Sequence, residues 1–94
     1  MTQPPKSHTF RGRRYTFGSI RRRGELGGCE GPFVREKRMD IPLEGDSLLD
    51  LSTVIHEGVH ACLWDLDEEA VTESANDIAR LLWRLGWRKQ EVED

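Results

Sequence analysis

Residues 53–62 read TVIHEGVHAC, and this stretch decides how the rest of the chain is interpreted. It places His56 and His60 at positions i and i+4, with Glu57 directly after the first histidine. On an α-helix that spacing puts both imidazoles on one face, about one turn apart. Two neutral imidazole nitrogens at that separation can hold one Zn²⁺ and leave room for a third ligand and a water. The stretch therefore predicts a zinc-binding helix.

Glu57 lies beside the line of the two imidazoles, where a carboxylate can take a proton from a metal-bound water and later give it to a leaving group. We therefore assign Glu57 as the catalytic base and acid. The alternative is a surface helix that happens to carry two histidines, since the pattern fixes only three positions. The surrounding run 51–64 favours the metal site, because Glu57 is its only charged residue and it contains no proline.

Cap and stop signals outline two helices around this motif. Ser47, with Asp50 three residues later, predicts an N-cap and a first helix over about 48–63. Its expected core-facing residues recur at steps of three and four: Leu48, Leu51, Ile55, Val59 and Cys62. Asp67 is expected to cap a second helix that stops near Gly86. The apolar stripe expected there comprises Val71, Ala75, Ile78, Leu82 and Leu85.

The second helix is expected to supply the third metal ligand. A short link makes the two helices an antiparallel pair, so a residue one to two turns into the second helix stands level with His60. Glu73 meets that condition, with Glu69 as the rival. Asp77 follows Glu73 by four residues, where it could accept a hydrogen bond from a ligand histidine. A solvated acidic face made of Glu69, Glu73 and Asp77 is the competing interpretation.

The first half of the chain reads as strands and loops. We expect residues 1–7 to be a disordered tail and residues 8–94 to form a single domain. Alternating charged and aromatic residues around Arg11-Gly12 predict a hairpin over about 8–17, which Ile20–Arg23 could extend. The glycine-rich segment 24–32 reads as loop, and 33–41 as another strand. The fold class predicted is α+β, a small antiparallel sheet of about three strands packed on two α-helices.

Charge is divided unevenly between the two halves. Residues 1–40 hold ten Lys and Arg against four acids, a net charge of +6, and the remainder holds four against thirteen, a net charge of −9. A basic half can meet nucleic acid or an acidic partner. The interpretation we favour is that the two halves attract each other across the fold. The three tryptophans are expected to pack inside: Trp64, Trp83 and Trp87.

Two cysteines, Cys29 and Cys62, are too few for a disulfide scaffold and indicate a reducing compartment. A single bridge between them is the alternative. No apolar run is long enough to span a bilayer. We therefore expect a cytoplasmic protein without a membrane partner, and the sequence leaves its oligomeric state open.

The motif His56-Glu57-Gly58-Val59-His60 followed by Glu73-Ser74-Ala75-Asn76-Asp77 resembles the gluzincin-type zinc metallopeptidases. In that class a Glu on the helix after the motif is the third ligand. An Asp four residues later supports a metal ligand without binding the metal itself. The layout also resembles small, mostly uncharacterised bacterial and phage HExxH proteins. In those proteins an acidic run opens the second helix, here Asp67-Glu68-Glu69-Ala70-Val71. The resemblance covers about residues 9–88 and implies a minimal zincin-like hydrolase.

The sequence thus predicts a metallopeptidase that hydrolyses peptide bonds through a zinc-activated water. Zn²⁺ is the expected cofactor, held by His56, His60 and Glu73 (or Glu69), and a peptide or protein is the expected substrate. One alternative is a non-catalytic binding or regulatory module that zinc stabilises. Another is a SprT-like, nucleic-acid-associated protein that uses the basic half, a partner we favour less.

Overall fold

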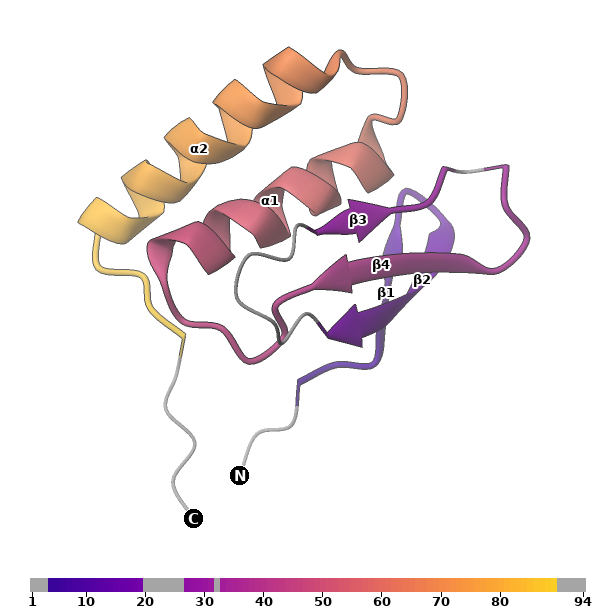
Figure 1. The fold of residues 1–94 in the computed structure, drawn as a ribbon, viewed down its shortest axis with the longest axis horizontal. Coiled ribbons are helices and arrows are strands. Elements are labelled where there is room, and N and C mark those ends of the chain that lie inside the picture. The colour runs from indigo at the N-terminus through magenta and orange to yellow at the C-terminus, as the bar shows by residue number, and fades with distance from the viewer. Residues whose placement is uncertain (1–3, 20–26, 32, 90–94) are drawn as a thin grey trace.

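The computed structural model of the chain describes residues 4–19, 27–31 and 33–89. Within them lie four strands and two helices, which confirms the α+β class (Figure 1). The strands are β1 (Ser7–Phe10), β2 (Arg13–Ser19), β3 (Gly28–Cys29) and β4 (Lys37–Ile41). The helices are α1 (Leu48–Cys62) and α2 (Glu68–Arg84).

The expected hairpin is present as β1 and β2. They pair antiparallel, with Ser7 opposite Thr16 and Phe10 opposite Arg13. Arg11 and Gly12 form the two-residue turn, and both have positive φ, 51° and 80°. Two central residues of positive φ match the right-handed twist of the flanking strands. β1 begins at Ser7, one residue before the predicted start of the hairpin.

The sheet is mixed and has four strands in the order β1-β2-β4-β3, which corrects the expectation of an antiparallel sheet of about three. β4 lies between β2 and β3, parallel to β2 and antiparallel to β3. The extra strand is β3, within the glycine-rich segment that we expected to be loop throughout. The possible strand at Ile20–Arg23 lies outside the described residues.

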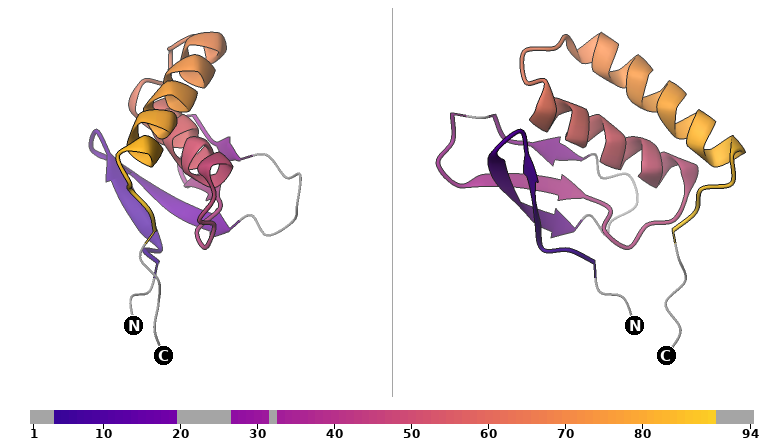
Figure 2. Two further views of the ribbon diagram at one scale, coloured as in Figure 1. Left: turned by 90° about the vertical axis from the view of Figure 1, so that its left-hand side faces the viewer. Right: turned by 180° about the vertical axis from the view of Figure 1, so that it is seen from behind.

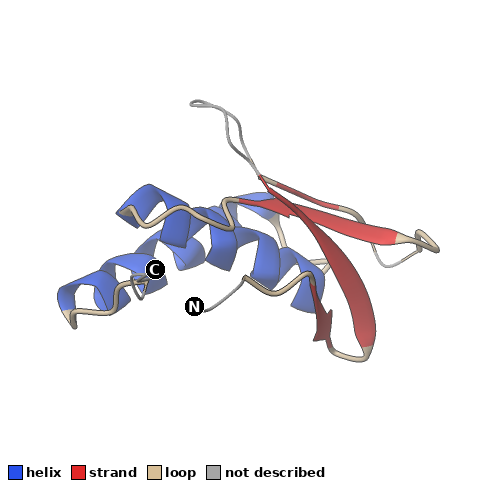
Figure 3. Ribbon diagram, turned by 90° about the horizontal axis from the view of Figure 1, so that it is seen from below, coloured by secondary structure: helices blue, strands red, loops and turns tan. Residues whose placement is uncertain are grey.

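The elements form three layers, with α1 between the sheet and α2 (Figures 1 and 2). Seen from below in Figure 3, the helices lie on one face of the sheet, and no described helix covers the other face. Side chains from the sheet and α1 meet in the buried core: Tyr15, Met39, Ile41 and Ala61. α1 is therefore the element that packs on both other layers.

The helix ends follow most of the sequence signals. Ser47 and Asp50 form a complete capping box at the start of α1, as predicted. Asp67 occupies the N-cap position of α2, but its side chain makes no capping hydrogen bond there. Gly86, with φ 94°, ends α2. The N–H of Trp87 then donates to the carbonyl of Leu82, which closes a Schellman turn.

The buried face of α2 is rotated from the stripe that we expected. Its fully buried residues are Val71, Ala75 and Ala79. Ile78 and Leu85 are 44% and 67% exposed. Small alanines let α2 approach α1 closely, whereas the larger Ile78 and Leu85 lie toward solvent. Neither helix of the described residues is long and apolar enough to cross a membrane.

Candidate metal centre

The two imidazoles of α1 meet on the side of the helix near its C-terminal end. The Nε2 atoms of His56 and His60 lie 3.1 Å apart, and both side chains are partly buried. A separation of four residues stacks them on one face, as the motif predicts. Both Nε2 atoms therefore point at the same small volume.

A carboxylate from α2 completes this arrangement. The Oε1 of Glu68 lies 2.9 Å from Nε2 of His56, and its Oε2 lies 2.7 Å from Nε2 of His60. Donor atoms of a tetrahedral zinc site are about 3.3–3.5 Å apart, given bond lengths of about 2.0–2.2 Å. The observed separations of 2.7–3.1 Å are about 0.2–0.8 Å shorter than that. Two imidazoles and one carboxylate are also a donor set that suits zinc.

Glu57 lies on the sheet side of the imidazoles and is 3% exposed. Its Oε1 is 3.8 Å from Nε2 of His56, and its Oε2 is buried without a hydrogen-bond partner among the described residues. Donor atoms of Glu57 and the two histidines all lie within 4.8 Å of one another, a spacing at which such a group can hold a metal ion. A buried carboxylate oxygen without a hydrogen-bond partner lowers the stability of the fold, and a polar group bound at the imidazoles would supply that partner.

Burial raises the pKa of the Glu57 carboxyl above its ordinary value, and the nearby charges of Glu68 and Asp40 add to the rise, while His56 opposes it. A raised pKa brings a carboxyl closer to the range in which it can both accept and release a proton. Glu57 is thus chemically distinct from Glu68, whose side chain is two-thirds exposed.

The backbone at Gly27 packs directly against the side chain of Glu57, because glycine has no side chain to keep them apart. A Cβ atom at this position would lie 2.8 Å from Cγ2 of Thr53 and 3.0 Å from Cγ of Glu57. Such distances are below normal carbon contacts, so only glycine allows the chain before β3 to approach α1 this closely. The close approach explains how a two-residue strand can cover a charged side chain.

The predicted ligands on α2 are not brought to the histidines. Glu73, Glu69 and Asp77 are all exposed, and Asp77 lies 3.3 Å from Arg80. Glu73 is five residues after Glu68, which corresponds to about 140° around the helix. Because Glu68 faces α1, Glu73 faces solvent. This arrangement matches the solvated acidic face that we gave as the alternative.

Sequence reasoning missed Glu68, although a signal for it was present. Glu68 precedes Val71 by three residues and Ala75 by seven, so it shares the buried face of α2. The first residue of α2 also stands close to the C-terminal turn of α1, because only residues 63–67 connect the helices. Reading α2 from its alanines would therefore have pointed to Glu68.

Cys29 and Tyr15 make no hydrogen bond to the imidazoles among the described residues. Burial, with a further contribution from Glu57, raises the pKa of the Cys29 thiol to about 11, so the thiol stays protonated at neutral pH. Both cysteines are free. Tyr15 is fully buried and its hydroxyl donates to the carbonyl of Glu30 at 3.2 Å. The only tyrosine of the chain is therefore a core residue.

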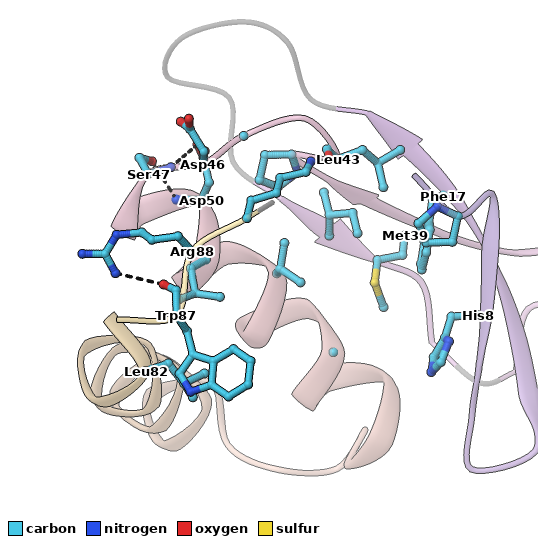
Figure 4. Close-up of a pocket in the computed structure, with 18 of the residues that line it drawn as sticks. His8, Phe17, Met39, Leu43, Asp46, Ser47, Asp50, Leu82, Trp87 and Arg88 are labelled. Atoms are coloured by element: carbon cyan, nitrogen blue, oxygen red, sulfur yellow. Dashed lines mark hydrogen bonds between the residues drawn. The ribbon is translucent and has the colours of Figure 1, made fainter. Parts of the chain in front are cut away.

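An apolar cavity of about 660 Å³ lies on the other side of α1, between the sheet and the end of α2 (Figure 4). From α1 it is lined by Leu51, Val54 and Gly58, which share a face. His60 is two residues beyond Gly58, about 200° around the helix. The cavity is thus separate from the candidate metal centre.

We found no family model, curated protein or solved structure that matches this chain.

Proposed function

We propose that this chain is a zinc-dependent metallopeptidase-like protein that hydrolyses peptide bonds, with His56, His60 and Glu68 as metal ligands. The observation that carries the proposal is the convergence of both Nε2 atoms on the carboxylate of Glu68, beside the buried carboxyl of Glu57. Structural zinc sites normally use four protein ligands, whereas catalytic sites use three and keep a position open. The three donors from α1 and α2 fit the second pattern.

Zinc bound there would supply a Lewis acid that polarises a carbonyl and lowers the pKa of a coordinated water. Glu57 would move the proton. Its carboxyl lies within 4.8 Å of the imidazole nitrogens and has an oxygen without a partner among the described residues. That oxygen can accept a proton from a water near the imidazoles and pass it to the leaving amine. The cover of Gly27 and Thr53 keeps Glu57 oriented for both steps.

A peptide is the substrate that the surroundings favour. β3 is an edge strand, since β4 is its only partner within the described sheet. It also packs against α1, the helix that carries the imidazoles. An extended peptide can add to such an edge through main-chain hydrogen bonds, and its carbonyls would then lie near α1.

The test is Glu57→Gln compared with Glu73→Gln, an equal change of charge on the exposed face of α2. We expect both variants to retain about one zinc per chain, measured by elemental analysis of untagged protein. Cleavage of a degenerate peptide library should fall by about 100-fold or more in Glu57→Gln only, since removal of a general base costs 10²–10⁴-fold. Wild-type cleavage by Glu57→Gln would place the base elsewhere.

A non-catalytic module that zinc stabilises is the second candidate, and one observation favours it. Tyr15 is buried in the core, so its hydroxyl cannot steady an oxyanion. If the zinc-loaded protein cleaves nothing in the library while zinc still raises its melting temperature, this candidate replaces the first.

A further inference from the structure

The basic residues of the first half gather at one end of the sheet. β2 and β4 run parallel, with Tyr15 opposite Lys37, so both strands begin at this end, and the β1–β2 turn lies there as well. Three cations come from the hairpin and three from the start of β4. They are Arg11, Arg13, Arg14, Arg35, Lys37 and Arg38. We call these six residues the basic end.

The basic end is open to solvent and little neutralised. Its arginines are exposed and Lys37 is partly exposed. Only Arg38 pairs with an acid, Asp40, among the described residues, at 2.8 Å. From the sequence we favoured an attraction between the two halves of the chain. In the described part of the chain, however, no ion pair joins a residue of the first half to one of the second. Six cations against Glu36 and Asp40 leave a net charge of +4 in residues 11–14 and 35–40.

Two aromatic side chains border the basic end. Phe33 is 89% exposed at a turn closed by the hydrogen bond from Val34 N–H to the carbonyl of Gly31. The ring of Trp64, which is 41% exposed, lies against Gly31, where a Cβ would meet it at 2.7 Å. Phe33 is only two residues from Gly31, at most about 7 Å along the chain. Both rings therefore flank the same turn, which leads into Arg35.

The metal centre is the neighbour of this surface. The guanidinium of Arg11 donates to the carbonyl of Cys62 at 2.8 Å, at the C-terminal end of α1. His60 is two residues earlier, about 3 Å along the helix axis. The hairpin turn thus brings the basic end next to the last turn of α1.

We propose that the basic end, with Phe33 and Trp64, binds single-stranded nucleic acid. Arginine guanidinium groups match phosphate oxygens in bidentate geometry, and exposed rings accept stacked bases. An acidic peptide would use the cations but would have no need of the two rings. A duplex would hide its bases from them. The binding surface goes beyond the proposed peptidase and does not depend on it.

The first measurement is fluorescence anisotropy of a labelled oligo(dT) of about 12 nucleotides with the full chain, a length within the site sizes of such proteins. We expect log K to fall linearly with log[salt], with a slope of about −3 to −4 for four to six phosphate contacts at about 0.7 each. No binding at about 50 mM salt would overturn the proposal.

Paired variants locate the surface. Arg14→Ala with Arg35→Ala should weaken binding by roughly 10-fold and reduce the slope by about 1.4, because two phosphate contacts are lost. Arg80→Ala with Arg84→Ala removes the same charge from α2 and should leave the slope unchanged. Equal losses in both pairs would show non-specific attraction and overturn the assignment. All variants change exposed residues, and their folding is checked by melting temperature.

The stacking contribution is tested separately. Phe33→Ala should weaken oligo(dT) binding by roughly 10-fold without changing the salt slope, since a ring carries no charge. Leu49→Ala, at a residue 75% exposed on α1, is the control and should bind as the wild type does. An unaffected Phe33→Ala, or a duplex bound as tightly as the single strand, would overturn the single-strand assignment. Competition by polyglutamate as strong as by unlabelled oligo(dT) would assign the basic end to acidic peptides.

Discussion

The two sides of α1 differ in how closely their neighbours pack. On the metal side, the chain before β3 approaches until a Cβ at Gly27 would lie 2.8 Å from Thr53 and 3.0 Å from Glu57. On the other side, Gly58 faces the cavity, and a Cβ there would meet only Phe10, at 3.7 Å. One helix thus has a tight side that carries polar groups and a looser apolar side. The difference separates the side of α1 that carries His56, Glu57 and His60 from the side that borders the apolar cavity.

The largest expected effect is on metal binding by the tight side. His60→Ala removes one of the three proposed ligands and should lower zinc affinity by more than about 100-fold, beyond the 10–100-fold typical of losing an outer hydrogen-bond partner. The matched control is His8→Ala, because His8 lines the cavity on the loose side. Competition with a chromophoric chelator measures both. Equal affinities in the two variants would show that the imidazole pair is not a metal site.

The next effect concerns the ligand that we propose on α2. Glu68→Ala should lower zinc affinity by roughly 10–100-fold, less than a histidine loss because its side chain is two-thirds exposed and water can replace it. Glu73→Ala and Glu69→Ala, on the exposed side of α2, should bind zinc as the wild type does. A large loss in Glu73→Ala with normal affinity in Glu68→Ala would restore the ligand that we predicted from sequence.

A smaller effect is expected on stability when the tight side is overpacked. Gly27→Ala forces a methyl group against Thr53 and Glu57 and should lower the free energy of unfolding by about 1–3 kcal/mol. Urea denaturation measures it. Unchanged stability would mean that the chain before β3 adjusts freely and that Glu57 is not held by this contact.

The smallest effect is a gain on the loose side. Gly58→Ala adds a methyl group in ordinary contact with Phe10 and should raise the free energy of unfolding by about 0.5–1 kcal/mol, because glycine is a poor residue inside a helix. That corresponds to a rise in melting temperature of a few degrees. A fall instead would show that the loose side is as constrained as the tight one.

Local signals in the sequence were enough for the hairpin, for both helices and for the pairing of His56 with His60. Each depends on residues only a few positions apart, such as the Ser47–Asp50 box. What the sequence did not reveal depends on distant residues. The parallel pairing of Tyr15 with Lys37 leaves no local pattern, and a strand as short as Gly28–Cys29 has no periodicity.

The position of Glu68 beside the histidines was missed for a similar reason. The position along the helix axis, compared with that of His60, allowed both Glu69 and Glu73. The rotation of α2 about its own axis decides which carboxylate meets α1. That rotation follows from the buried alanines Ala75 and Ala79, whereas our stripe included the larger Ile78 and Leu85. Small residues at a close helix contact contribute little to a hydrophobic pattern, so the buried face of α2 was predicted incorrectly.

The sheet order also has a consequence for how the chain folds. The β1–β2 hairpin and the α1–α2 pair each join neighbouring segments, so they can form early and independently. β4 must instead find β2 across the chain between Ser19 and Lys37, and only then do Tyr15 and Met39 share a core. Closing that loop costs entropy before the core contacts form. We therefore expect the docking of β4 to limit the folding rate, with the centre of the sheet as the last part to become ordered.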